Sequence, residues 1–432
     1  MKLTVFQAGK GDCLLLTSSD GKKMLVDGGV AAAYTANVAP KLEQLKQLEV
    51  VCVSHIDDDH IGGVLQMLDD EAAWRVYMYQ QDAGNTSFPR PDAKRPPEIG
   101  KLWHNGFSDL IGQNTGDIAE MLSHSVRVLS GAESAELQQI GAALQNLTEG
   151  VKQAIQLSRR IGDKQLGIPL NPEFGNKLML LDENGTTPPL KLGNISLLLV
   201  GPTVKELDAL RKEWQDWLRK NKTALTGLRR AARDDEDLLG NRAGGEAWRG
   251  AELTGLMANA LAQADALGTG KVTPPNLASM ALLAEENGKT ILLAGDARGK
   301  EMLNGLRSQG QLDAAGRLHL DVLKVPHHGS EKNMDEAFCE AVTADHYLFC
   351  ANGFSENPDP RILQAIVDAR LGDPNDRRKF KFWFNNNANT TSDKYKAHMT
   401  AVENKVTELA ADSQGRLTYF FLSNGDSFDL PF

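Results

Sequence analysis

Short apolar runs separated by polar turns fill the first fifty residues of the chain. Their alternation of apolar and polar positions predicts three strands, over residues 2–6, 13–17 and 23–26. A Ser-Asp-Gly-Lys turn at 19–22 predicts that the second and third of these strands form a hairpin. Apolar residues spaced three to four apart predict a helix over 34–48, and the uninterrupted apolar run 50–53 predicts a buried strand after it. This order of elements is typical of the front half of a layered α/β domain.

The rest of the chain repeats both patterns. Helical spacing predicts helices over 64–74 and over most of 118–161, and a proline-rich stretch predicts a loop over 88–97. Apolar runs predict further strands, over residues 75–79, 179–181, 195–200, 280–284, 290–293, 321–326 and 377–384. No fixed period repeats along the sequence, which argues against a solenoid or a propeller.

One segment of the chain differs from the rest in its charge. Amphipathic helices are predicted over 204–218 and 253–267, and between them residues 229–250 carry charge blocks and several glycines but few apolar side chains. We therefore expect residues 203–272 to form a helical subdomain inserted into one domain built from 1–202 and 273–432. The charged stretch is expected to be an exposed, mobile loop at which a protease or a regulatory protein acts; a plain surface loop is the alternative.

Composition places the chain among soluble globular proteins. Of its 432 residues, 41% are hydrophobic and 24% are charged, and no apolar run approaches the length of a membrane span. We expect a cytoplasmic protein without a membrane partner. The four cysteines lie in apolar contexts without paired spacing, which predicts buried core residues. The net charge of -10 argues against nucleic-acid binding over the whole surface, so any binding of DNA or RNA requires a local basic groove.

The polar turn after the apolar run at 50–53 carries the densest chemistry in the sequence. Residues 54–63 read Ser-His-Ile-Asp-Asp-Asp-His-Ile-Gly-Gly, so imidazoles at both ends enclose a run of carboxylates. Packing these groups together costs repulsion and desolvation, which a divalent cation offsets. The turn therefore predicts metal binding by His55, Asp57, Asp59 and His60. The alternative, a solvated acidic loop, gives no reason for a histidine at each end.

Other strand ends supply residues suited to the same centre. Asp296 and the pair His327-His328 each follow a predicted strand, and a dinuclear site needs neutral imidazole together with a carboxylate placed between two ions. Asp27, followed by two glycines, is predicted to accept a hydrogen bond behind the ligands, with a simple turn as the alternative. His104 follows a short apolar approach and is a candidate ligand, although a lone histidine is more often structural.

Together these motifs resemble the metallo-β-lactamase superfamily. The resemblance rests on His-x-Asp-x-Asp-His at 55–60, Asp-Gly-Gly at 27–29, Gly-Asp at 295–296 and His-His-Gly-Ser at 327–330. It is strongest to the metallo-hydrolase domain of bacterial DNA-uptake channel proteins and their soluble relatives. It implies an α/β fold, namely an αβ/βα sandwich with a helical insertion, and a hydrolytic site with metals at the strand ends between two sheets.

The resemblance also implies two divalent ions. The family's ligand positions map onto His55 and Asp57 for one ion, Asp59, His60 and His327 for the other, and Asp296 between them. His328 is expected behind the ligands. Asp57 stands where the wider superfamily more often has histidine, and this harder oxygen ligand makes manganese as suitable as zinc. The superfamily's middle histidine has no clear match, which leaves His104 as a candidate and a single ion as an alternative.

The implied reaction is hydrolysis by a metal-bound hydroxide. Asp59 is the residue expected to orient or deprotonate the attacking water. A phosphodiesterase or nuclease acting on DNA or RNA is the leading prediction, because Lys324 lies beside the site in sequence and Lys379 and Lys381 share one face of a strand whose phenylalanines pack inward. Two alternative functions remain, an ester or lactone hydrolase and a non-catalytic binding module. For the strand with Lys379 and Lys381, the alternative is an edge strand that these lysines merely solubilise.

Overall fold

The computed structural model describes residues 1–106, 153–182, 184–205, 207–208, 279–372 and 376–432. Strands from both sides of the segment 203–272 build the larger of two sheets. The charged loop at 229–250, the helix at 253–267 and most of the helices at 118–161 and 204–218 lie outside the described residues. The inserted subdomain and the regulatory role of its loop therefore remain predictions.

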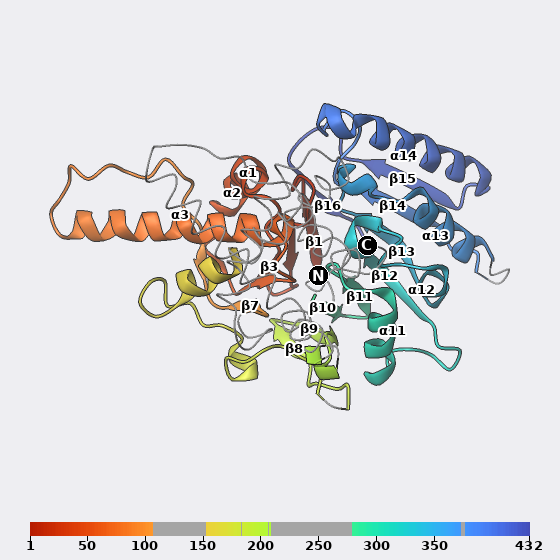
Figure 1. The fold of residues 1–432 in the computed structure, drawn as a ribbon, viewed down its shortest axis with the longest axis horizontal. Coiled ribbons are helices and arrows are strands. Elements are labelled where there is room, and N and C mark those ends of the chain that lie inside the picture. Colours follow the sequence, from red (N-terminus) through yellow and green to blue (C-terminus); the bar gives the residue numbers. More distant parts are fainter. Residues whose placement is uncertain (107–152, 183, 206, 209–278, 373–375) are drawn as a thin grey trace, which may run out of the picture.

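Two mixed sheets form the centre of the molecule (Figure 1). The first has six strands, in the order β16 (Ser427–Leu430), β1 (Lys2–Phe6), β2 (Leu14–Thr17), β3 (Lys23–Val26), β5 (Val50–Val53) and β7 (Leu102–His104). The second has eight, in the order β15 (Leu417–Phe421), β14 (Phe380–Phe384), β13 (Val342–Phe349), β12 (Leu318–Lys324), β11 (Lys289–Leu293), β10 (Ala281–Glu286), β9 (Ile195–Gly201) and β8 (Leu190–Leu192). A separate short pair joins β4 (Gln47–Leu48) to β6 (Glu98–Ile99).

Helices cover the outer face of each sheet. On the first sheet lie α1 (Ala31–Ala33), α2 (Ala39–Leu42) and the long α3 (Asp58–Asp82), and on the second lie α11 (Gly299–Ser308), α12 (Glu336–Ala341), α13 (Pro360–Gly372) and α14 (Asp393–Asp412). Figure 1 shows the two groups of helices on opposite sides, with α3 extending away from the sheets. The predicted αβ/βα sandwich is confirmed.

Strand β5 shows why this layering follows from the sequence. All four of its residues are buried, because Val50 and Cys52 face the core between the sheets whereas Val51 and Val53 pack against the helices. A strand covered on both faces needs an uninterrupted apolar run, which is the pattern of this segment. The predicted strands at 2–6 and 23–26 agree with β1 and β3 to the residue.

Three predicted elements are wrong. Residues 75–79 are not a strand but continue α3 to Asp82, with an ion pair between Arg75 and Glu71 one turn earlier at 2.7 Å. The segment 34–48 is not one helix: a π-helical turn (Tyr34–Val38) and α2 end at Leu42, and the chain then extends into β4. Leu181 forms only an isolated bridge with Thr203, so the strand at 179–181 does not form.

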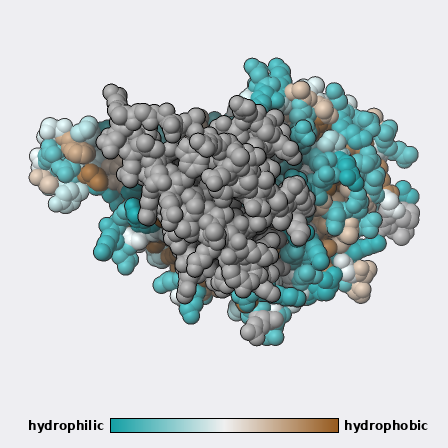
Figure 2. Space-filling model, viewed as in Figure 1, coloured by the Kyte–Doolittle hydropathy of each residue, from teal (hydrophilic) through white to brown (hydrophobic). Residues whose placement is uncertain are grey.

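The remaining composition-based expectations concern cysteines and membranes. All four cysteines are buried and free, as predicted. Within the described ranges, no helix combines the length and the apolar character needed to cross a bilayer. Figure 2 shows mainly hydrophilic side chains on the visible described surface, including the part over α13 and α14.

Candidate metal centre

The polar motifs of the sequence meet where the strands end between the two sheets. The turn after β5 carries the segment 54–57, and the segments after the parallel strands β11 and β12 carry Asp296 and His327. Two backbone hydrogen bonds join these segments: Met280 N–H donates to Ser54 O at 2.9 Å, and His327 N–H donates to Gly295 O at 3.1 Å. The centre therefore lies at the junction of the sheets, on backbone that the sheets hold in place.

Glycines allow the backbone around this turn to pack closely. A Cβ on Gly11 would lie 1.7 Å from Asp59 O, and a Cβ on Gly63 would lie 2.0 Å from Gly28 O. Because no side chain fits at either position, the loop before β2 and the loop after β3 both pack directly on the first turns of α3. These contacts fix where α3 begins, and hence where the side chains of Asp59 and His60 point.

The histidine pair after β12 has an unusual backbone. His327 and His328 both lie in the left-handed region, with φ of 46° and 58°, which is costly for residues with a Cβ. His327 Nδ1 pairs with Asn333 Oδ1 at 2.5 Å, and His328 Nδ1–H donates to Cys350 O at 2.6 Å. With both Nδ1 atoms engaged, each ring presents Nε2 to the centre.

The ligand atoms fall into two groups that share Asp296. In the first group, His55 Nε2 lies 3.4 Å from Asp296 Oδ2 and 3.7 Å from Asp57 Oδ2, and His327 Nε2 lies 3.5 Å from Asp296 Oδ2. These separations leave room for one ion among side chains carried by the segments that follow β5, β11 and β12. A carboxylate with ligands on both of its oxygens is well placed to bridge two ions.

The second group approaches the same carboxylate through both of its oxygens. His60 Nε2 is 3.4 Å from Asp296 Oδ1, and His328 Nε2 is 3.3 Å from Asp59 Oδ2 and 3.7 Å from Asp296 Oδ2. The structure thus places His328 beside Asp59, whereas the sequence predicted it behind the ligands. His327, expected in this group, lies with the first group instead, so the adjacent histidines point to different ions.

A second layer of hydrogen bonds orients His60. Asp27 accepts from the Ser54 backbone N–H at 2.7 Å, from Ser54 Oγ at 2.8 Å and from His60 Nδ1 at 2.9 Å. Because a carboxylate only accepts, Nδ1 keeps its proton, and when His60 is neutral Nε2 is the lone-pair nitrogen that can bind a metal. Asp27 therefore selects the ligand atom of His60.

The buried polar atoms fit a metal. Within the described part of the chain, His55 Nε2, His60 Nε2, His328 Nε2 and Asp296 Oδ1 are buried without a hydrogen-bond partner. Buried polar atoms without partners are rare and costly in folded proteins, and here all four converge on the two groups. Imidazole nitrogen and carboxylate oxygen are ligands for both zinc and manganese, so the donor set fits divalent ions of this kind.

The protonation equilibria of the centre are coupled to metal binding. Burial and the neighbouring His55 lower the pKa of His60, but the carboxylates of Asp296, Asp27 and Asp12 outweigh them and raise it to about 9. Burial also lowers the pKa of His328, but the carboxylates of Asp296, Asp12 and Asp59 have the larger effect and raise it to about 10. In the absence of an ion these histidines hold protons at neutral pH, which a metal must displace.

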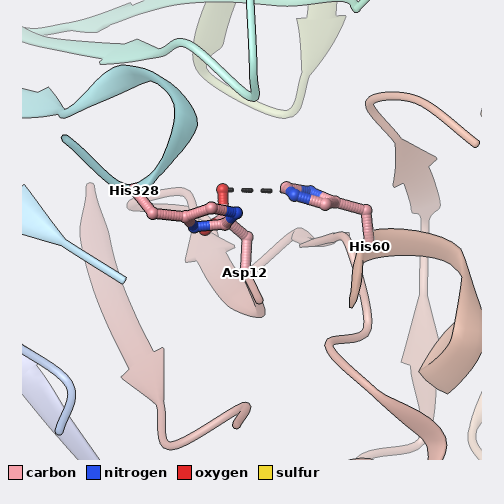
Figure 3. Close-up of side chains that lie close together, drawn as sticks. All are labelled: Asp12, His60 and His328. Carbon is pink, nitrogen blue, oxygen red and sulfur yellow. Dashed lines mark ion pairs between the residues drawn. The ribbon is translucent and has the colours of Figure 1, made fainter. Parts of the chain in front are cut away.

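Asp12 and Lys324 lie beside the centre as well, where the sequence analysis gave Lys324 a contact with substrate and Asp12 no role. Asp12 is 1% exposed and projects between His60 and His328 (Figure 3). It forms an ion pair with Lys324, whose side chain is also 1% exposed. A lysine buried in this way cannot reach a substrate outside, so Lys324 is an internal cation. The Gly-Lys-Gly-Asp sequence that ends at Asp12 predicted a turn and fitted the resemblance to the DNA-uptake subgroup, but it assigned no role to Asp12.

Three other candidate residues lie away from the two groups. His104 is buried at the end of β7, where burial lowers its pKa to about 4, and it belongs to neither group of clustered ligand atoms among the described residues. Lys381 Nζ lies 3.8 Å from the centroid of the Trp383 ring, and the register places Trp383 level with Lys324. Lys379, which is exposed, precedes Trp383 along the same strand direction and therefore lies roughly 13 Å from the level of Lys324, since a strand rises about 3.3 Å per residue.

A family model agrees with the fold of the first part of the chain. Residues 7–102 match the family model of the metallo-beta-lactamase superfamily. Among solved structures, the chain is similar to Zn2+-bound PqqB from Methylobacterium extorquens, with 10% identity, a TM-score of 0.32 and coverage of 100% of both chains. No curated protein matches the sequence. The resemblance to DNA-uptake proteins stays a prediction. The matched segment includes the turn from His55 to His60, so residues 7–102 are similar to a metallo-beta-lactamase superfamily domain and contribute to a candidate metal site.

Proposed function

We propose that the protein is a metal-dependent hydrolase that cleaves phosphodiester bonds in nucleic acid. The observation that carries this proposal is the pair of ligand groups on the two sides of the Asp296 carboxylate. Two divalent ions bound there supply Lewis-acid polarisation of the scissile group and a water of lowered pKa. Two-metal centres of this kind suit in-line displacement at phosphorus, because they stabilise both the attacking and the leaving oxygen.

The chain's own residues position the reactants. Asp59 is partly exposed, with 13% of its side chain accessible against 27% for Asp57 and 2% for Asp296. Burial alone would raise its pKa, but the approach of His328 Nε2 at 3.3 Å and the charge of His60 hold the pKa of Asp59 well below the usual range. Asp59 is therefore anionic at neutral pH, and we assign it the orientation of the attacking water rather than the uptake of its proton.

A lysine and an aromatic ring at the rim support the choice of phosphodiester. Lys10 Nζ lies 3.6 Å from Asp58 Oδ2, next to Asp59, and 4.6 Å from the centroid of the Phe354 ring. Phe354 in turn contacts Tyr395 edge to face, with ring centroids 5.9 Å apart. A cation beside half-exposed rings offers a phosphate contact and a stacking surface for a base.

The proposal is tested by incubating zinc- or manganese-loaded protein with single-stranded DNA, double-stranded DNA, RNA and a panel of chromogenic esters. Chelator-treated protein and the metal-loaded Asp59→Ala variant are the controls. We expect cleavage of a nucleic acid that both controls lack. Hydrolysis of the esters alone would replace this proposal with a small-molecule esterase, and no turnover on any substrate would support a binding module.

A further inference from the structure

A buried lysine lies next to the carboxylate that joins the two ligand groups. Lys324 Nζ donates to Gly295 O at 3.0 Å and lies 3.9 Å from Asp296 Oδ1. Asp296 Oδ1 is the oxygen that His60 Nε2 approaches at 3.4 Å, and it has no hydrogen-bond partner among the described residues. Lys324 and an ion of the second group therefore approach the same oxygen atom.

Asp12 holds the lysine in this position and is not itself suited to bind an ion. The imidazole nitrogens that approach Asp12 are His60 Nδ1 at 4.0 Å and His328 Nδ1 at 3.4 Å (Figure 3). Both nitrogens already pair elsewhere, with Asp27 at 2.9 Å and with Cys350 O at 2.6 Å. An ion among Asp12, His60 and His328 would have to break these bonds and displace the lysine. We therefore assign Asp12 as the counter-charge of Lys324.

A buried ion pair such as that of Asp12 and Lys324 carries a large desolvation cost. Moving two charges out of water costs several kcal/mol per ion, and an apolar pair of the same volume commonly stabilises a fold as well or better. The position of the pair suggests a purpose other than stability, because a fixed cation about 4 Å from a ligand oxygen opposes the binding of another cation there. The first group is less affected, since His55 and His327 approach only the other oxygen, Oδ2, whereas the second group approaches Oδ1 through His60 and Oδ2 through His328.

We propose that Lys324, held by Asp12, is a resident cation of the centre that weakens binding of the second ion. The two sites then fill in order, the group of His55 and His327 first and the group of Asp59, His60 and His328 second. Turnover consequently follows the supply of free metal rather than the amount of protein alone. This inference rests on the two-ion centre of the proposed function but not on its substrate.

Calorimetric titration of metal-free protein with zinc, and separately with manganese, tests the inference, because two variants should change the Kd of the weaker ion in opposite directions. Lys324→Met removes the cation and leaves Asp12 anionic, so the Kd of the weaker ion should fall by about tenfold or more. Asp12→Asn leaves the lysine uncompensated and should raise the same Kd by a similar factor. The double variant removes both charges, and its Kd should return to within a few-fold of wild type. The tighter ion should change less in every variant.

A merely structural role of the pair predicts a different pattern, in which both single variants weaken both ions. Lys289→Met is the matched control, because Lys289 pairs with Asp321 at 2.7 Å on the same sheet, away from the centre. If Lys324→Met alone does not fold, the comparison of Asp12→Asn with the double variant still isolates the lysine. Changes of the same sign would overturn this inference while leaving the two-ion centre intact. Binding of no second ion by any variant would overturn both.

Discussion

Asp27→Asn tests whether the carboxylate behind His60 selects its ligand atom. Asp27 is 1% exposed and accepts three hydrogen bonds, two from Ser54 and one from His60 Nδ1, over 2.7 to 2.9 Å. An amide has a single oxygen, so it accepts from Ser54 or from His60 while its NH2 group faces the other. With the oxygen towards Ser54, the NH2 group favours the His60 tautomer that carries its proton on Nε2, and this tautomer cannot bind a metal.

The structure sets the size of the expected effect. Loss of a partner that orients a metal-ligating histidine weakens metal binding by roughly 10- to 100-fold, which is about 1.4–2.8 kcal/mol. The free energy of unfolding of the metal-free protein should fall by about 1–3 kcal/mol, because one buried charge-assisted hydrogen bond is lost. Calorimetric titration measures the first quantity, and urea unfolding measures the second.

A surface aspartate provides the control. Asp429 also accepts a side-chain hydrogen bond, from Thr4 Oγ1 at 2.6 Å, but it lies on the edge strand β16. Asp429→Asn should leave metal affinity unchanged. If Asp27→Asn folds normally and its metal affinity stays within twofold of wild type, the hydrogen bond does not select the ligand atom and the reasoning is refuted.

Three further predictions concern packing, pH and the rim. Gly11→Ala places a Cβ against Asp59 O and should abolish metal binding or folding, whereas Gly372→Ala, at a helical position with open space around it, should be tolerated to within about 1 kcal/mol; thermal melts with and without zinc compare them. The raised pKa values of His60 and His328, about 9 and about 10, stabilise the metal-free fold below pH 6.5, so its Tm should fall as pH rises from 6.5 to 10; a constant Tm would contradict the assigned charges. Phe354→Ala should raise KM for an oligonucleotide several-fold and leave kcat largely unchanged, with Phe354→Tyr close to wild type, and an unchanged KM would remove the ring from the substrate site.

The periodicity of apolar residues and the burial of each element's faces explain how much of the fold the sequence predicts. Segments such as 2–6 and 50–53 are predictable because the residue pattern records burial directly: residues 2–5 alternate between outer and buried positions, whereas all four residues of 50–53 are buried. The extension of α3 to Asp82 was missed because its second half leaves the core. Val76 and Tyr79 are 50% and 70% exposed there, so no apolar stripe marks the helix.

The candidate site shows a different limit of sequence reasoning. The turn from His55 to His60 is readable because its ligands are consecutive, and Asp27 because two glycines follow it. The directions of His327 and His328 depend on two successive left-handed residues, a conformation that no local pattern predicts for histidine. The pairing of Asp12 with Lys324 joins residues 312 positions apart (324 minus 12), and only the meeting of the two sheets brings them together.

Anomalous X-ray scattering from crystals of the protein saturated with zinc tests the two-ion centre most directly. The structure predicts two anomalous peaks on either side of the Asp296 carboxylate, about 3.5–4 Å apart. One peak should contact His55, Asp57 and His327, and the other should contact Asp59, His60 and His328. A single peak at saturation, or a peak coordinated by Asp12 or His104, would contradict the account.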